Sequence, residues 1–305
     1  MYKIVTDGSC DLSVERIKEL DIEVIPFYVS TDGINHQKEV VDLDIRDFYQ
    51  FMVDNPKVFP KTSMPSIQDY LDVFMPILKA GNDIICICIS TKFSGSFNSA
   101  INAKNILLDN YPDAKIEIID ATVNTVLQGM LIEEAVIKKN LGASFEETVS
   151  YVNEIKKTGR IFFTIDGMDY LVHGGRVGKL SGIAAGALGI KPLILLKEGE
   201  IFNNGITRGR KKSKQKIIEQ IISYFKDNRF DVDDYRFCVG FGYNYDEAKE
   251  FKDNFVAALK EFEPNFNDEV YIRQNRTFTG ISKDGGNSTP LIIIDDVIQL
   301  GTNGQ

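Results

Sequence analysis

Short apolar runs alternate with longer amphipathic stretches along the first 160 positions of the chain. The run at 83–89 (DIICICI) is continuously apolar, which is typical of a parallel strand that is buried on both faces. At 45–54 the apolar residues instead recur on one side of a helix. The pattern predicts strands at 2–6, 22–29, 83–89 and 115–119, and helices at 13–20, 45–54, 66–78, 97–108, 124–140 and 145–157. This alternation indicates an α/β fold whose mostly parallel sheet carries helices on both faces.

The second half of the chain has a different order of predicted strands and helices. Two strand-like runs, 192–197 and 200–203, are separated only by Glu198-Gly199, which is a hairpin signal. Further strands are expected at 161–165, 236–241, 269–273 and 291–295, with helices at 213–226 and 246–261. Hairpins mixed with helices favour a C-terminal α+β domain with antiparallel strands. We therefore expect two closely packed domains, 1–160 and 161–305, with a cleft between them.

Composition and charge narrow the class of protein. The chain has 305 residues, 43% of them hydrophobic, and a net charge of −9. An acidic chain repels phosphate backbones, so nucleic acid is not expected as a partner. No apolar run approaches the roughly 18 residues of a membrane span, and the N-terminus lacks a signal-like apolar region. These features predict a cytoplasmic protein without a transmembrane segment.

Cysteine and histidine usage argues against a metal centre. The four cysteines, at positions 10, 86, 88 and 238, form no C-x-x-C motif and are expected to be buried thiols. Only two histidines occur, His36 and His173, and neither has a second ligand at metal-binding spacing. No metal and no cofactor are expected.

Hydroxyl side chains crowd the segment 61–66 (KTSMPS), just before a predicted helix. Ser63 or Ser66 can serve as the helix cap, and Pro65 suits the first turn. Thr62 precedes either cap, so its hydroxyl is available to meet a ligand.

A second polar cluster, 90–100 (STKFSGSFNSA), follows the most apolar strand and enters a helix. Ligands of open α/β sheets bind beyond the carboxyl ends of the strands, and a helix N-terminus favours an anionic oxygen there. Ser94, Ser96 and Asn98 are the candidate side chains for binding such an oxygen. Ser94 can also be interpreted as a nucleophile, but the local sequence holds no histidine base.

The third polar cluster, 7–11 (DGSCD), follows the first strand. Its acidic side chains can bind a metal or orient neighbouring hydroxyls, but the pattern is more typical of a turn followed by a helix cap.

Two later segments invite functional interpretations. The glycine-rich stretch 174–182 lacks the G-x-x-x-x-G-K-[ST] spacing of a P-loop, because Leu180 follows Lys179. We expect it to be a helix entry that packs on the first domain. The basic run 207–216 is either a solvated helix start or a docking patch for an acidic protein or lipid head groups.

These clusters together resemble the DegV family. The resemblance rests on 7–12 (DGSCDL), 62–66 (TSMPS) and 94–100 (SGSFNSA), in that order and spacing, with 174–176 (GGR), 190–193 (IKPL) and 208–212 as later segments. It covers nearly the whole chain.

The resemblance implies a carrier that encloses one long-chain fatty acid, such as palmitate, and has no catalytic residues of its own. Thr62 and Ser94 would hold the carboxylate, with Ser63, Ser96, Asn98 and Ser282 as further candidates. The acyl tail would lie in a buried tunnel between the domains. A separate fatty acid kinase subunit would phosphorylate the presented carboxylate.

The kinase and the membrane surface are the partners to consider. The candidate docking residues are Arg176, Arg208, Arg210 and Lys211, and transient contact with a membrane surface fits a lipid carrier. The chain departs from the family pattern at Ser282 and Tyr243, where relatives carry histidine.

Two other hypotheses stand beside the carrier. One is a hydrolase or phosphotransferase that uses Ser94, with Asp7 or Asp120 as base. The other is a regulatory docking protein that acts through the basic patch 208–216.

Overall fold

The computed structural model describes residues 1–39, 41–165, 169–176, 180, 189–267, 269–274 and 291–296. Within these residues the N-terminal sheet has the strand order β2-β1-β6-β7, and all of its neighbouring strands are parallel. The strands are β1 (Tyr2–Asp7), β2 (Glu23–Ile25), β6 (Asp83–Cys88) and β7 (Ile116–Asp120). The predicted parallel sheet is confirmed.

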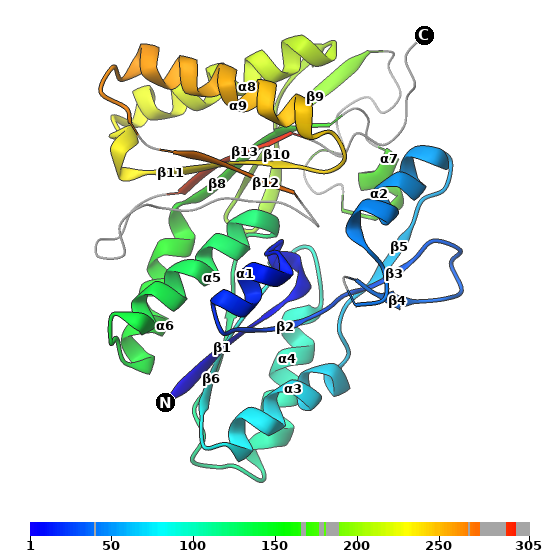
Figure 1. Ribbon diagram of the computed structural model, residues 1–305, viewed down its shortest axis with the longest axis vertical. Coiled ribbons are helices and arrows are strands. Elements are labelled where there is room, and N and C mark those ends of the chain that lie inside the picture. Colours follow the sequence, from blue (N-terminus) through cyan, green and yellow to red (C-terminus); the bar gives the residue numbers. More distant parts are fainter. Residues whose placement is uncertain are drawn as a thin grey trace.

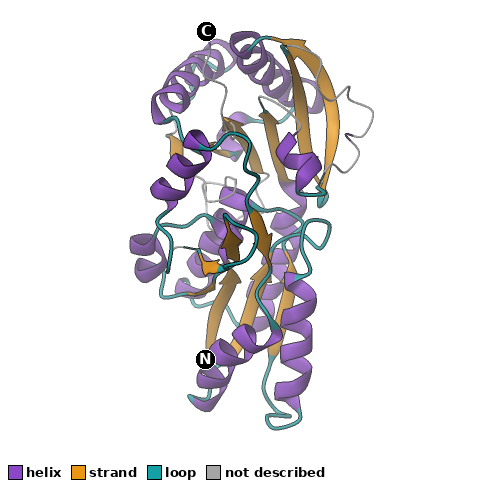
Figure 2. Cartoon of the chain, turned by 90° about the vertical axis from the view of Figure 1, so that its right-hand side faces the viewer, coloured by secondary structure: helices purple, strands orange, loops and turns teal. Residues whose placement is uncertain are grey.

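Helices cover both faces of this sheet, as Figures 1 and 2 show. Side chains alternate between the faces, so Ile85 and Ile87 pack on one side while Ile84 and Cys86 pack on the other. The first face is covered by α1 (Val14–Glu19) and α5 (Thr125–Asn140), and the second by α3 (Ile67–Lys79) and α4 (Ser96–Leu108). The helix α6 (Phe145–Ile155) packs beside α5.

A small antiparallel sheet corrects one sequence-based expectation. The run 22–29 is not one strand, because it divides into β2 and β3 (Tyr28–Ser30), which belong to different sheets. The strand β3 lies between β4 (Gln37–Lys38) and β5 (Lys61–Ser63). Pro26 interrupts the run and cannot donate to a strand ladder. The helix α2 (Ile45–Asp54) connects β4 to β5.

The C-terminal sheet is mixed, with the order β10-β9-β8-β13-β11-β12 among the described residues. The predicted hairpin of β9 (Ile190–Lys197) and β10 (Glu200–Arg208) is confirmed, and β8 (Gly159–Thr164) pairs antiparallel with β9. The remaining pairs are parallel and involve β11 (Arg236–Phe241), β12 (Val270–Gln274) and β13 (Leu291–Asp296). One face is covered by α8 (Arg210–Asn228) and α9 (Tyr245–Phe262), seen at the top of Figure 1.

The helix α5 lies between the two large sheets (Figure 1). Its residues share one continuous core with Ile85 and Ile87 of the N-terminal sheet and with Ile161 and Ile194 of the C-terminal sheet. Every residue from Thr125 to Val136 is buried. This part of the helix contacts a sheet on each side and has no solvent face, which is why most of its residues are apolar and why Gln128, Glu133 and Glu134 are paired with side chains of neighbouring elements.

Candidate functional site

The turns after β1 and β6 lie side by side at the carboxyl edge of the N-terminal sheet. The two strands pair in parallel up to Thr6 and Ile87, so both chains leave the sheet at the same edge. The turn after β1 is the short 3₁₀ helix η1 (Gly8–Cys10), and the turn after β6 runs through Ser94 into α4. This edge is where open α/β sheets bind ligands.

A buried polar network connects the two turns through Asp7. Its Oδ2 accepts hydrogen bonds from Ser96 Oγ at 2.7 Å and from the backbone N–H of Ile89 at 3.0 Å. Its Oδ1 lies 2.7 Å from Ser9 Oγ and 2.8 Å from Gln128 Nε2 of α5. Burial raises the pKa of the Asp7 carboxyl, against the opposing effect of these hydrogen bonds. Of the roles considered for this acidic cluster, the structure shows Asp7 orienting neighbouring hydroxyls.

Ser96 and Ser94 occupy different environments. Ser96 is fully buried, and its Oγ also lies 2.7 Å from Tyr70 Oη of α3. Ser94 is half-buried, and its Oγ accepts a hydrogen bond from the backbone N–H of Ser96 at 3.2 Å. Among the described residues no acceptor holds the Ser94 hydroxyl proton, so this hydroxyl can donate to a ligand.

Thr62 lies in β5, an element that the sequence did not reveal. It pairs with Val29, whereas Ser63 pairs with Tyr28, so the two hydroxyl residues point to opposite faces of the small sheet. Both are exposed. The cap of α3 is Ser66, which forms a capping box with Asp69. The prediction that Thr62 has no capping role is confirmed.

The segments that carry Thr62 and Ser94 meet at Met64. A Cβ built on Gly95 would lie 2.6 Å from the Met64 sulfur, so glycine permits this close approach. The two hydroxyl-bearing segments are therefore neighbours, although they are about thirty residues apart in the sequence. Asn98 is exposed on the first turns of α4, just beyond this contact.

Residues of the second half of the chain hold the same turn. Arg176 Nε donates to the carbonyl oxygen of Phe93 at 3.1 Å. The hairpin turn between β9 and β10 also contacts it, because Ser90 Oγ donates to the carbonyl of Gly199 at 3.0 Å. Arg176, a candidate docking residue in the sequence analysis, thus lies beside Ser94, and it is exposed.

Two further contacts surround this region. The His173 ring of α7 (Asp169–His173) stacks on Phe59, with ring centroids 3.7 Å apart. Tyr243 donates to Gln50 of α2 at 2.7 Å, while Arg46 lies over its ring. These contacts connect the segment before Thr62 to the second half of the chain. Ser282 falls outside the described residues.

Neither proposed base contacts Ser94. The Asp7 carboxyl bonds Ser96 instead, and Asp120 Oδ2 accepts from Thr91 Oγ1 at 2.7 Å. Within the described ranges, no group of three histidine, cysteine or acidic side chains is arranged to hold a metal ion. No described helix is long and apolar enough to cross a membrane.

Some side chains of the basic run 207–216 form ion pairs within the protein. Arg210 forms two hydrogen bonds with Glu247 of α9, at 2.8 and 3.1 Å, and Lys214 contacts Glu247 and Glu250. These pairs join α8 to α9. Arg208 and Lys211, in contrast, are exposed.

Gln128 and Tyr70 are two residues of this network that were not predicted from the sequence. Both are fully buried and both bond members of the Asp7 network. Gln128 had a visible signal, because it is a polar residue in an otherwise apolar part of a helix. Tyr70 had none, since a tyrosine on an amphipathic helix is ordinarily part of the core.

Comparison with known proteins places the chain among relatives. The family model described as "uncharacterised protein, DegV family" matches residues 1–268. A DegV domain-containing protein of Caldanaerobacter subterraneus subsp. tengcongensis is 32% identical over 257 residues, which are 84% of this chain and 86% of the relative.

Solved structures agree with this match. A stearic acid-binding protein from Eubacterium ventriosum is 43% identical, with a TM-score of 0.81 over 85% of this chain and 88% of the other. A fatty acid-binding DegV family protein from Thermus thermophilus is 21% identical, with a TM-score of 0.74 over 90% and 92%, and therefore supports the fold alone. From the family match and these relatives, we conclude that the chain belongs to the DegV family.

Proposed function

We propose that this protein is a carrier that binds one long-chain fatty acid and holds its carboxylate between Thr62 and Ser94. The observation that carries the proposal is the meeting of these two segments at Met64 and Gly95, beside the N-terminus of α4. Two hydroxyl donors and a helix N-terminus form an environment that suits an anionic oxygen. The similarity to a stearic acid-binding protein at 43% identity supports the choice of ligand.

Charge beside the turn fits the same ligand. The Arg176 guanidinium lies against the Phe93 carbonyl and adds a positive charge near Ser94. The acyl tail would run through an apolar tunnel between the two halves of the chain, which we propose as two domains meeting near residue 160. Burial of each methylene contributes about 0.8 kcal/mol, so a long tail binds well without a strong head-group contact.

The carrier role is non-catalytic in this proposal. A nucleophilic Ser94 would need a base within hydrogen-bond reach, and among the described residues neither Asp7 nor Asp120 contacts it. Presentation of the carboxylate to a separate kinase would use the exposed Arg208 and Lys211, whereas Arg210 is occupied by Glu247.

Substitution of the two hydroxyls tests the head-group site. Thr62→Ala and Ser94→Ala should each weaken binding of palmitate by about 5- to 30-fold, the effect of losing one hydrogen bond to a charged group. Titration calorimetry on delipidated protein measures the affinities. Ser63→Ala is the matched control, because Ser63 lies on the opposite face of the same strand.

The ligand itself is tested by denaturing mass spectrometry of the purified protein. We expect an extractable fatty acid. The proposal fails if no acyl species is extracted and the protein takes up neither palmitate nor oleate.

A further inference from the structure

Ser9 Oγ lies between two oxygens that both act as acceptors. It is 2.7 Å from Asp7 Oδ1 and 2.6 Å from Gln128 Oε1. Both distances are at or below the usual length of an O–H···O hydrogen bond, so each contact needs a proton of its own. A serine hydroxyl has only one.

Rotating the Gln128 amide does not remove this conflict. Its Nε2 lies 2.8 Å from Asp7 Oδ1, 3.0 Å from Thr6 Oγ1 and 3.4 Å from the carbonyl oxygen of Ile87. Exchanging the nitrogen and oxygen would place the amide oxygen against the Asp7 carboxyl and the Ile87 carbonyl. In that orientation the 2.8 Å contact with Asp7 Oδ1 would itself lack a proton, so one proton is missing either way. The Gln128 oxygen faces Ser9, because this orientation keeps an N–H toward the Ile87 carbonyl, and Ser9 donates to it.

From this proton count we infer that Asp7 is a neutral carboxylic acid in the folded protein, and that it donates its proton from Oδ1 to Ser9 Oγ. Ser9 then donates to Gln128 Oε1, and every short contact of the network holds one proton. Asp7 Oδ1 still accepts from Gln128 Nε2 through a second lone pair.

The other carboxyl oxygen positions the turn that carries Ser94. Oδ2 accepts from Ile89, where the chain leaves β6, and from Ser96, where α4 begins. Because Ser96 gives its proton to Asp7, Tyr70 must donate to Ser96 Oγ. Asp7 is thus a positioning residue that holds both ends of this turn.

A neutral Asp7 also suits an anionic ligand, and this step rests on the proposed function. An ionised carboxylate beneath the turn would repel a fatty acid carboxylate at Ser94. A protonated one keeps the same hydrogen bonds to Ser96 and Ile89 without that repulsion.

The surroundings of Asp7 favour the neutral form. Asp7 is fully buried, and burial raises the pKa of its carboxyl. The titratable groups that face it from packed elements are Tyr70 of α3 and Cys88 of β6, whose pKa values burial raises well above their ordinary values, with Cys86 beyond them. In the described part of the chain its hydrogen-bond partners are all uncharged.

The pH dependence of stability tests the inference. The unfolded chain loses the Asp7 proton near pH 3.9, whereas the folded chain keeps it to higher pH. The folded state then binds more protons, so the stability of the wild type should fall relative to Asp7→Asn as pH rises from about 4 to the folded pKa. Denaturant midpoints of both proteins from about pH 4 to about pH 8 show the difference.

Asp69→Asn is the control of opposite sign. Asp69 is desolvated, but hydrogen bonds from Ser66, Tyr28 and Lys38 lower its pKa to about 2. Its contribution to stability is therefore lost as pH falls through about 4 to about 2, and it should stay constant above that range.

Infrared spectroscopy gives a readout that needs neither a ligand nor a stability measurement. Ligand-free wild type at neutral pH should show the C=O stretch of a protonated carboxyl, and Asp7→Asn should lack it. Should Asp7→Asn fail to fold, Ser9→Ala serves instead, because loss of the acceptor shifts this band without removing it.

Two outcomes would overturn the inference: a spectrum without a protonated carboxyl band, or a wild type that does not lose stability relative to Asp7→Asn above about pH 4. Both measurements use ligand-free protein, so a failure of the fatty acid proposal leaves them unaffected.

Discussion

Ser94 and Ser96 are two positions apart, yet their hydroxyls differ in burial and in hydrogen bonding. The Ser96 hydroxyl is fully buried and bonded to Asp7 and Tyr70. The Ser94 hydroxyl accepts a hydrogen bond from the Ser96 amide and, among the described residues, has no acceptor for its own proton. In a hydroxyl-rich turn, the members whose donors are already used support the structure, and those with a donor available can bind a ligand.

Gly129 of α5 packs too closely on η1 to accept a side chain. A Cβ at this position would lie 2.1 Å from the backbone carbonyl oxygen of Cys10, which cannot move without displacing η1. Gly129→Ala should lower the free energy of unfolding by about 1–3 kcal/mol. The clash should outweigh the gain in helix propensity, which is at most about 1 kcal/mol.

Chemical denaturation measures this change. Met130→Leu, a volume-conserving change on the same buried helix, is the control and should cost less than about 1.5 kcal/mol. An alanine variant as stable as the wild type would show that α5 and η1 pack less closely than the structure indicates.

Candidate site residues could be recognised from the sequence where the signal lies within a short segment. The hydroxyl clusters at 62–66 and 94–100 stood out as polar segments beside predicted helix starts. The roles within each cluster were not readable, because they depend on partners such as Tyr70 and Gln128 that are distant in the chain.

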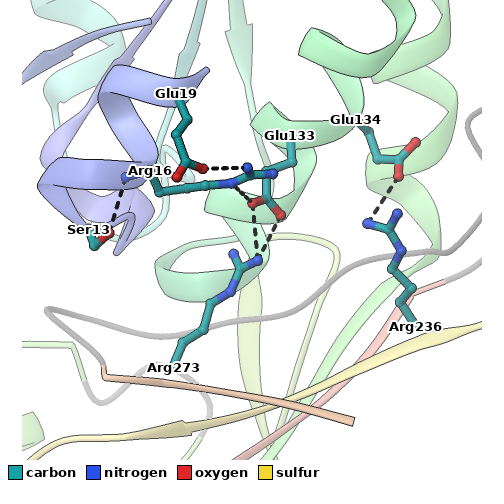
Figure 3. Close-up of polar contacts among 7 residues, drawn as sticks. All are labelled: Ser13, Arg16, Glu19, Glu133, Glu134, Arg236 and Arg273. Atoms are coloured by element: carbon teal, nitrogen blue, oxygen red, sulfur yellow. Dashed lines mark hydrogen bonds and ion pairs between the residues drawn. The ribbon is translucent and has the colours of Figure 1, made fainter. Parts of the chain in front are cut away.

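The helix α5 carries two adjacent acidic residues that face the C-terminal sheet (Figure 3). Glu133 accepts from Arg16 of α1 at 2.7 Å and from Arg273 of β12 at 2.9 Å. Glu134 lies 3.6 Å from Arg236 of β11 and accepts from Tyr151 at 2.6 Å. Burial raises the pKa of Glu134, while Tyr151 and Arg236 oppose this effect.

Glu133→Gln tests how strongly these ion pairs join the elements. The glutamate side chain is 3% exposed, so its replacement leaves two arginines facing a neutral amide in a region of low water content. We expect a loss of roughly 2–3 kcal/mol in the free energy of unfolding, measured by urea denaturation.

Glu154→Gln is the matched control for that change. Glu154 pairs with Lys157 on the surface, where both side chains are 62% exposed, and its loss should cost less than about 1 kcal/mol. Equal effects of the two substitutions would contradict a structural role for the Glu133 ion pairs.

The order of helices and strands was predicted well because periodicity is a local property. The exceptions among the described residues are β3, β4 and β5, which are two or three residues long, and α7, which has five residues. Segments this short show no recognisable period, and their pairing depends on strands brought together by the fold.

The proposed site lies where the two halves of the chain meet. Arg176 and Gly199 from the second half contact the turn that carries Ser94, and α5 is packed between the two large sheets. A ligand bound at this junction should stabilise both halves together.

Thermal unfolding measures that stabilisation. Palmitate at about 100 times its Kd should add about 2.7 kcal/mol to the stability of the delipidated protein and raise its Tm. Shorter saturated acids at the same concentration should raise it less, since each missing methylene removes about 0.8 kcal/mol of binding. Shifts that do not depend on chain length would contradict a buried acyl tail.

Periodicity and local chemistry were enough to predict the type and order of most elements, the parallel character of the first sheet and the positions of its polar turns. These properties follow from the spacing of apolar residues and from the chemistry of short segments. Three features of the site depend on the folded chain: β1 and β6 are neighbours, Met64 meets Gly95, and Asp7 is enclosed by Ser9, Ser96 and Gln128. Most of these contacts join residues far apart in the chain, and the burial that raises the pKa of Asp7 depends on them, so neither the contacts nor the pKa shift could be predicted from local sequence.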